Sequence, residues 1–245
     1  MVTIDAKGVY YKELNEKVKE AISSGAEHIE LINVNGQRYI GDGISASAKI
    51  TIHGIPGNDM AAFMNGPTIE VFGNGQDAVG NTMNSGTIVI HGNAGDVTGY
   101  AMRGGEIFIK GNVGYRVGIH MKAYQDKVPV MVIGGKAGDF FAEYMAGGKI
   151  ILLGLGCEGE SVVGRYCATG LHGGTLYIRN NFEERYFGKE VQRDELTMED
   201  KEFLKSYLTR FSDYFGYDKQ EILGLDFIKF VPVGSRPYGN MYAKW

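Results

Sequence analysis

Proline is scarce in this sequence, with 5 in 245 residues, and glycine shows no three-residue period. These two absences exclude a low-complexity Pro/Gly chain and a collagen-like helix. The hydrophobic fraction is 44% and the charged fraction is 22%, which are ordinary values for a globular protein. Such a chain can bury a sizeable core, so wholesale disorder is excluded as well.

Cysteine is equally scarce, with Cys157 and Cys167 as the two in the chain. A disulfide framework needs more cysteines, and a metal site needs closer pairs such as C-x-x-C. We therefore expect two reduced thiols in the core of a cytoplasmic protein.

A cationic excess and long apolar runs are also missing. The chain has 25 Lys and Arg against 29 Asp and Glu, a net charge of −4, which gives no electrostatic footprint for nucleic acid or an anionic membrane. No stretch of about 18 apolar residues could span a bilayer, and the N-terminal MVTIDAKGVYYKEL lacks the apolar run of a signal peptide. We expect a cytoplasmic protein that binds neither nucleic acid nor membrane.

Glycine, in contrast, is abundant, with 37 residues, and it recurs at fixed intervals. Segments such as IEVFGNGQDAVGNTMNSG and IVIHGNAGDVTGYAMRGG align on an anchor glycine that ends an apolar run. The intervals between successive anchors are 19, 19, 19, 24 and 19 residues. The anchors, and the second glycines that follow several of them by three residues, are expected to be structural turn glycines: Gly54, Gly57, Gly73, Gly92, Gly95, Gly111, Gly114, Gly135, Gly138 and Gly154.

The apolar columns of the repeat predict the fold. Apolar residues stand four and two positions before each anchor, which is the period-two pattern of a half-buried strand. Nineteen residues are too few for a βαβ crossover but suit one coil of a parallel β-helix. The expected fold is therefore all-β, a right-handed parallel β-helix with about 19 residues per coil and six to seven coils. Ten residues after five of the anchors, one methionine per coil is expected in the core: Met64, Met83, Met102, Met121 and Met145.

Two polar and conformational expectations accompany this fold. Glycine at fixed columns is expected to supply the positive φ values of tight bends and to let adjacent coils approach closely. Asn74, Asn93 and Asn112 follow successive anchors, and we expect them to stack as an amide ladder.

The two ends of the chain differ from its middle, as the ends of a solenoid must. Residues 12–24 have helical apolar spacing with Gly25 as the C-cap, and Thr197 with Asp200 resembles a capping box before an apolar helix. We divide the chain into a helical N-terminal cap (1–28), the β-helix (29–182) and a helical C-terminal cap with a tail (183–245).

Two patterns, a glycine run and a histidine pair, could indicate a binding site, and the serines and cysteines could indicate nucleophilic catalysis. The run GLGCEG at 154–159 matches a G-x-G-x-x-G nucleotide fingerprint, but no helical period follows it. His53 and His91 lie two coils apart, about 10 Å, which is too far to share a zinc ion. No G-x-S-x-G elbow is present, and neither cysteine has an adjacent His and acid. We expect no catalytic, cofactor-binding or metal-binding residues in this chain.

The C-terminal tail, SRPYGNMYAKW, contains residue types that are enriched at interface hot spots. The candidate partner interface is Arg236, Tyr238, Tyr242 and Trp245. A cap that folds back on the rod accounts for the same residues equally well.

The repeat resembles the G-x-G-x-G β-helix domain at the C-terminus of the glutamate synthase large subunit. The segment 92–105, GNAGDVTGYAMRGG, carries the strongest match, and the resemblance extends over about residues 30–180. The chain is similar to the stand-alone form of this domain, in which the glutaminase, the synthase and the β-helix are separate polypeptides. The insert at 122–129 departs from the family pattern.

The resemblance implies a non-catalytic scaffold, associated with an oxidoreductase, that holds a glutaminase-type and an FMN/Fe–S synthase subunit and helps to wall the ammonia path. It implies no cofactor in this chain, since FMN and iron–sulfur clusters belong to the partners. The module also looks like the β-helical scaffold subunit of formylmethanofuran dehydrogenase, which implies an equivalent role there; a homo-oligomer is compatible with either. A free-standing, esterase-like hydrolase with a groove along the rod is the hypothesis from another class.

Overall fold

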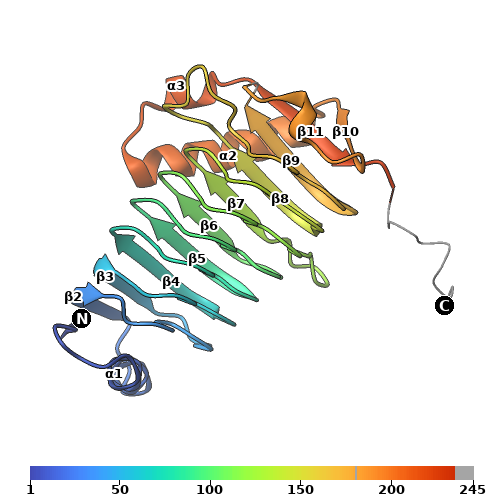
Figure 1. The fold of residues 1–245 in the computed structure, drawn as a ribbon. Helices are drawn as coiled ribbons and strands as arrows, with labels where there is room; N and C mark the ends of the chain where they lie inside the picture. The colour runs from blue at the N-terminus through green and yellow to red at the C-terminus, as the bar shows by residue number, and fades with distance from the viewer. Residues whose placement is uncertain (180, 235–245) are drawn as a thin grey trace, which may run out of the picture.

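The computed structural model describes residues 1–179 and 181–234. Within them, an eleven-stranded sheet runs the length of the molecule (Figure 1), and its first nine strands follow the chain order and pair in parallel. β9 then pairs antiparallel with β11, and β11 with β10. The expected parallel β-helix is confirmed. The strands are β1 (Val2–Asp5), β2 (His28–Asn35), β3 (Lys49–Ile55), β4 (Asn65–Phe72), β5 (Ser85–Ile90), β6 (Glu106–Ile109), β7 (Val130–Ile133), β8 (Ala146–Leu152), β9 (Gly173–Arg179), β10 (Val191–Asp194) and β11 (Phe227–Pro232).

The interior of the rod is built from stacked columns of like side chains. Ile50 pairs in register with Ile69, which pairs with Ile88, and the column two residues later is stacked in the same way. Both columns and the five methionines are buried, as the repeat predicts. Burial of each such side chain contributes about 1.5–3 kcal/mol relative to exposure, so stacking supplies the core that a single coil lacks.

The loop half of each coil contains three left-handed residues at alternate positions. Most of them are not glycine: φ is 57° at Phe63 and 50° at Val97. Their N–H groups bond alternately to the two neighbouring coils, since Phe63 donates to the Asn81 carbonyl of the next coil and Ala61 to the Ile40 carbonyl of the preceding one, both at 2.8 Å. A left-handed conformation at a non-glycine residue lowers stability by roughly 1–2 kcal/mol. Because every coil repeats this conformation, the cost is a general property of this coil geometry and does not mark a particular site.

The anchor glycines are explained by close approach, and the expectation of positive φ there is largely wrong. Among the anchors, φ is positive at Gly54 and Gly154 but not at Gly73, Gly92, Gly111 or Gly135. A Cβ at Gly73 would overlap the Gly54 carbonyl oxygen of the preceding coil. At Gly92, Gly111 and Gly135 the Cβ would overlap an Asn Oδ1 of the preceding coil, and at Gly154 it would overlap the Val162 side chain, so these positions have no room for a side chain.

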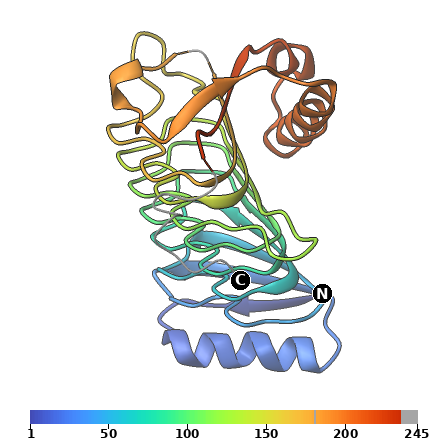
Figure 2. The same cartoon turned by 90° about the vertical axis from the view of Figure 1, so that its right-hand side faces the viewer.

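The N-terminal end is closed by α1 (Tyr11–Ser23), which lies across the end of the stack (Figure 2). Its Leu14 and Val18 are buried against the first coil, and Gly25 follows it with φ at +90°. β1 pairs in parallel with β2. This strand was not expected, so the N-terminal cap is a strand and a helix rather than a helix alone.

The C-terminal cap begins with η1 (Glu184–Tyr186) and β10, and continues through α2 (Met198–Phe215) and α3 (Lys219–Leu223) to β11. The capping box at Thr197 and Asp200 is present, and Gly216 ends α2 with φ at 72°. β11 covers the exposed edge of β9, as the C-terminal end of a solenoid requires.

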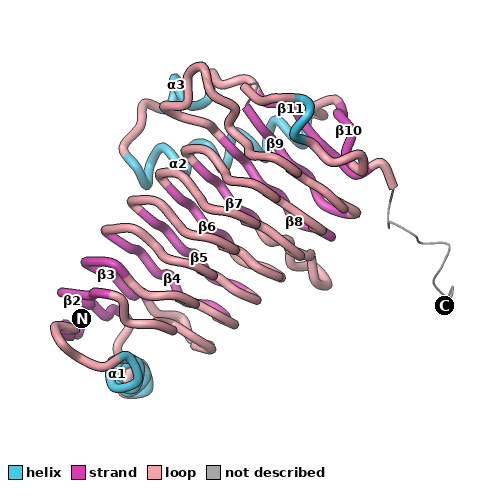
Figure 3. The backbone as a smooth tube through the Cα atoms, viewed as in Figure 1, coloured by secondary structure: helices cyan, strands magenta, loops and turns pink. Residues whose placement is uncertain are grey.

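The outer face of the sheet is covered by α2 over part of its length. Figure 3 shows the loops in front of the strands and α2 behind them. The outward column changes character along the rod: it holds Thr3, Glu30, Thr51 and Glu70 in β1–β4, and then Val89, Phe108, Val132, Ile151 and Tyr177 in β5–β9. The apolar half forms a second core with Leu204, Leu208, Phe211 and Phe215 of α2. The helix thus covers the strands whose outer residues need burial.

Candidate interaction surfaces

The asparagines after the anchors form a ladder, but they do not stack amide on amide. Instead, Asn74 Oδ1 accepts the backbone N–H of Asn93 at 2.9 Å, and Asn93 Oδ1 accepts that of Asn112 at 2.8 Å. A second ladder, three residues further on, uses carboxylates: Asp77 Oδ1 accepts the N–H of Asp96 at 2.9 Å. These polar side chains satisfy the backbone of the next coil, so they are engaged in structure rather than available for chemistry.

The glycines of the repeat make both ladders possible. A Cβ at Gly111 would overlap Asn93 Oδ1, and a Cβ at Gly114 would overlap Asp96 Oδ1. Each of these glycines therefore pairs with an Asn or Asp of the preceding coil. Because glycine has no side chain, the amide or carboxylate oxygen of that Asn or Asp has space to reach the backbone of the next coil.

The histidine column on the sheet is an aromatic stack. The Phe72 ring lies between His53 and His91, with ring centroids 5.3 and 4.4 Å away and nearly parallel planes. His91 Nε2 lies 3.0 Å from Glu70 Oε1, and His53 Nε2 lies 3.2 Å from Glu30 Oε1. The two imidazoles are separated by a phenyl ring and each has its own carboxylate, an arrangement unsuited to a shared metal ion.

The cysteines and the run 154–159 also have structural surroundings. Both thiols are free and buried. Burial raises the pKa of Cys167 far above its usual value, and burial also raises that of Cys157, so neither thiol is activated as a nucleophile. The run 154–159 follows β8 as a loop, and β9 is the next element after it, so the helix N-terminus that a nucleotide phosphate needs is missing from this place.

A polar contact between α2 and the sheet is centred on Glu106. Arg210 donates to both carboxylate oxygens of Glu106, and the Tyr207 hydroxyl donates to one of them at 2.7 Å. Burial alone would raise the pKa of Glu106, but the hydrogen bonds from Arg210 and Tyr207 outweigh it and lower the pKa. This contact fixes the helix on the rod.

The loop half of the rod exposes a strip of aromatic rings. The Arg116 guanidinium lies 4.3 Å from the centre of the Phe140 ring, and Phe140 stacks on Tyr166 at 4.9 Å. A parallel column pairs His120 with Tyr144 at 5.7 Å. The loop-side aromatic strip, as we name it, comprises Phe63, Tyr100, Tyr115, Phe140, Tyr144 and Tyr166, all of them exposed except the half-buried Phe140. Phe140 stands five residues after its anchor, and Phe63 and Tyr144 stand nine after theirs, but Tyr100 and Tyr115 stand eight and four residues after theirs. The repeat columns therefore signal the strip only in part.

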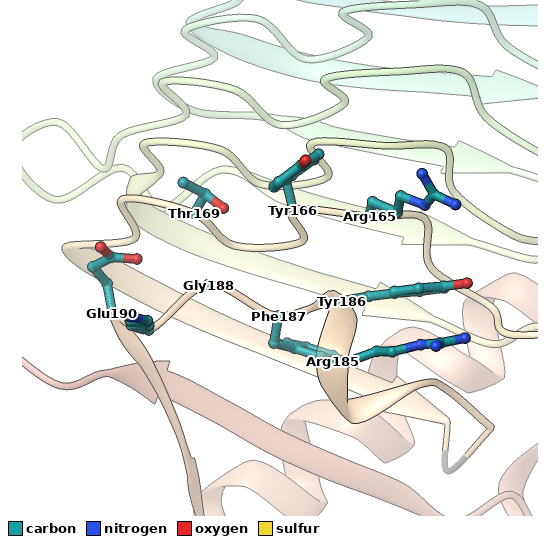
Figure 4. Close-up of a pocket in the computed structure, with 9 residues that line it drawn as sticks. Arg165, Tyr166, Thr169, Arg185, Tyr186, Phe187, Gly188 and Glu190 are labelled. Atoms are coloured by element: carbon teal, nitrogen blue, oxygen red, sulfur yellow. The ribbon is translucent and has the colours of Figure 1, made fainter.

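One end of the strip opens into a groove of about 520 Å³ between residues 165–169 and 185–190 (Figure 4). Arg165, Tyr186 and Arg185 extend side by side toward one end of the groove, and Glu190 lies at the other end. Glu190 Oε2 accepts the backbone N–H of Gly170 at 3.2 Å. The two segments are one coil apart, and a parallel bridge joins Cys167 to Phe187. Because the sequence analysis ends the β-helix at residue 182 and places 185–190 in the cap, the groove was not predicted.

The insert at 122–129 forms a small hairpin. Tyr124 and Lys127 exchange two backbone hydrogen bonds of 3.0 Å, and Gln125 has φ at 57°. The extra residues therefore leave the coil and return to it, so that β7 still pairs in register with β6.

Three further expectations concern the C-terminal tail, metal binding and membrane-spanning helices. The candidate partner interface of Arg236, Tyr238, Tyr242 and Trp245 lies outside the described residues. In the part of the chain that the structure describes, no three His, Cys, Asp or Glu residues gather as they would around a metal ion. None of the described helices combines the length and apolar character needed to cross a membrane.

Comparison with known proteins identifies the family. The sequence model of the family described as "GXGXG motif" matches residues 12–233. A relative, "Uncharacterized protein MJ1350" of Methanocaldococcus jannaschii, is 52% identical over 251 residues, which cover 99% of this chain and 96% of the relative. The anchors, the ladders and the stacked core described above all lie within the matched range. The chain therefore belongs to the GXGXG-motif family, the family of the C-terminal GXGXG domain of glutamate synthase.

Proposed function

We propose that this protein is a non-catalytic scaffold subunit of a glutamate synthase-like complex. In this proposal the rod holds a glutaminase-type subunit and an FMN/Fe–S synthase subunit, which carry the cofactors, and helps to wall the path of ammonia between them. Family membership supports a glutamate synthase-related role. The free, buried thiols agree with a cytoplasmic location.

The observation that carries the proposal is a rigid rod with an exposed loop-side aromatic strip. Tyr and Arg are enriched at the energetic centres of protein interfaces. The strip presents Tyr, with Arg116 against its Phe140 ring, on a backbone held by hydrogen bonds between coils. The Asn and Asp side chains of the rod's repeat are hydrogen-bonded in the two ladders, and the two thiols are buried. The surface is suited to binding proteins.

Reconstitution tests this function. The glutaminase-type and synthase-type subunits from the same genome are purified and assayed for glutamine-dependent glutamate formation, with and without this chain. We expect the chain to raise glutamate formation and to lower the release of free ammonia, because a walled path prevents loss to solvent. Equal rates and equal ammonia release with and without the chain would contradict the proposal.

A further inference from the structure

We propose that the groove between residues 165–169 and 185–190 docks an acidic peptide segment of a partner subunit. In this arrangement the carboxylates of the segment pair with Arg165 and Arg185, and its backbone and apolar atoms contact Tyr166 and Tyr186. The inference rests on the proposed function, since it requires that the rod has partner subunits.

The charges of the groove support an acidic occupant. Among the residues that the structure describes, neither Arg165 nor Lys189 forms an ion pair. Arg185 meets Glu183 at 3.5 Å, and both side chains are exposed, so this pair contributes little. The cationic groups therefore lack strong counter-charges in the described chain, and carboxylates from a partner would supply them.

The rings beside these cations are held in place before any partner binds. Tyr166 is 55% exposed and stacks on Phe140, whose backbone N–H donates to the Arg165 carbonyl at 2.8 Å. The Arg165 N–H in turn donates to Asp139 Oδ1 at 2.8 Å. Because the backbone is fixed, binding loses little conformational entropy, which is the property of an interface hot spot.

The groove favours a protein segment over a nucleic acid. The chain has a net charge of −4, and Glu190 lines the groove at the end opposite Arg165 and Arg185 (Figure 4). A polyanion that ran along the whole groove would meet this carboxylate, whereas a short segment places its few charges only at the cationic end. Glu190, at the other end, is engaged by the Gly170 N–H.

The test measures binding of this chain to the glutaminase-type and synthase-type subunits of the same genome. The double variant Arg165→Glu/Tyr166→Ala is compared with Lys12→Glu/Tyr10→Ala at the far end of the rod. Tyr10 is a matched control because it is 60% exposed and its ring is packed against one aromatic neighbour, Tyr11, at 4.6 Å. We expect the groove variant to weaken binding to one partner at least about 10-fold and the control variant to leave it unchanged. Binding of the wild-type chain should also weaken with salt, and that of the groove variant should depend less on salt.

The outcomes separate the two proposals. If the wild-type chain binds and both variants bind equally well, the docking site is wrong and the scaffold function stands. If the wild-type chain binds neither subunit, the scaffold function fails and the docking site with it. A single-stranded oligonucleotide that displaces the partner from the groove would also overturn the inference. Should the groove variant lower the denaturation midpoint, Arg185→Gln/Lys189→Gln on the other wall tests the same claim.

Discussion

At most anchor positions, atoms of the preceding coil fill the space that a side chain would need. The Gly54 carbonyl lies where a Cβ of Gly73 would be, and Asn93 Oδ1 lies where a Cβ of Gly111 would be. At the left-handed positions, in contrast, alanine already occurs: Ala61 and Ala142 have φ at 63° and 56°. The repeat therefore needs glycine for contact between coils more than for backbone torsion.

Gly73→Ala is expected to destabilise the protein by about 2 kcal/mol, because the backbone it would overlap cannot move without shifting a coil. Urea denaturation followed by circular dichroism gives the change in free energy of unfolding. Gly234→Ala is the matched control, since a Cβ there meets no atom of the described residues within 4 Å and its φ is not positive. Equal stability of the two variants would contradict the role of close approach.

Gly80→Ala is expected to cost only about 1 kcal/mol, although φ at Gly80 is 69°. The added Cβ would meet the end of the flexible Ile107 side chain at 2.7 Å, which can move. The same denaturation measurement should rank Gly80→Ala as milder than Gly73→Ala. The reverse order would show that torsion, and not contact between coils, selects glycine.

The asparagine ladder predicts energetic coupling between Asn93 and Gly111. Asn93→Ala alone is expected to cost about 1 kcal/mol, because the N–H of Asn112 loses its acceptor. In a Gly111→Ala background the Asn93 side chain is already displaced, so Asn93→Ala should cost almost nothing more. A double-mutant cycle measures this coupling, and simple additivity of the two changes would argue against the ladder.

At the scale of elements, α2 is positioned by an apolar surface and oriented by polar contacts at Glu106 and Asp200. Phe211 and Leu208 pack on the outer residues of β5–β9, while Arg210 and Tyr207 hold Glu106. A buried network at the start of the helix adds to this: the Tyr177 hydroxyl donates to Asp200 at 2.6 Å, and Lys229 Nζ donates to the same carboxylate at 2.9 Å. Burial opposes the charge of Asp200, yet these hydrogen bonds lower its pKa.

Glu106→Gln is expected to destabilise the protein by about 1–3 kcal/mol at neutral pH, because it removes the charge that faces Arg210. The pKa of Glu106 is lowered on folding, so its contribution is full above the usual value of 4.5 and is lost as the pH falls through the lower folded pKa. The stability difference between wild type and Glu106→Gln should therefore be constant from about pH 6 to 8 and shrink below about pH 4. A difference that grows on acidification would contradict this ion pair.

At the scale of the whole molecule, the features that repeat in the sequence were predictable and those that join distant segments were not. The Ile and Met columns specify the coil because each repeats one residue type at one position. The outward column changes from Glu70 to Val89, which marks where α2 begins to cover the sheet. This change can be recognised only after the inward columns have been assigned, because they define which residues face outward. The left-handed φ of Phe63 and Val97 opposes their intrinsic preference, and hydrogen bonds between coils impose it. The groove forms between residues 165–169 and residues 185–190 one coil later, where the apolar columns of the repeat have ended, so the columns do not signal it.

The rod also explains why a scaffold can be built from short repeats. Each coil contributes its own stacked core, so length is added without changing the cross-section, and the loop-side aromatic strip lies on the loop half of the coils. Partners bound along such a rod would keep their relative positions.

Native mass spectrometry of the two proposed partner subunits, mixed with and without this chain, tests the scaffold claim most directly. We expect a three-component complex when the chain is present and no stable association of the two partners when it is omitted. A glutaminase-type and a synthase-type subunit that assemble equally well without the chain, or that never bind it, would contradict the account.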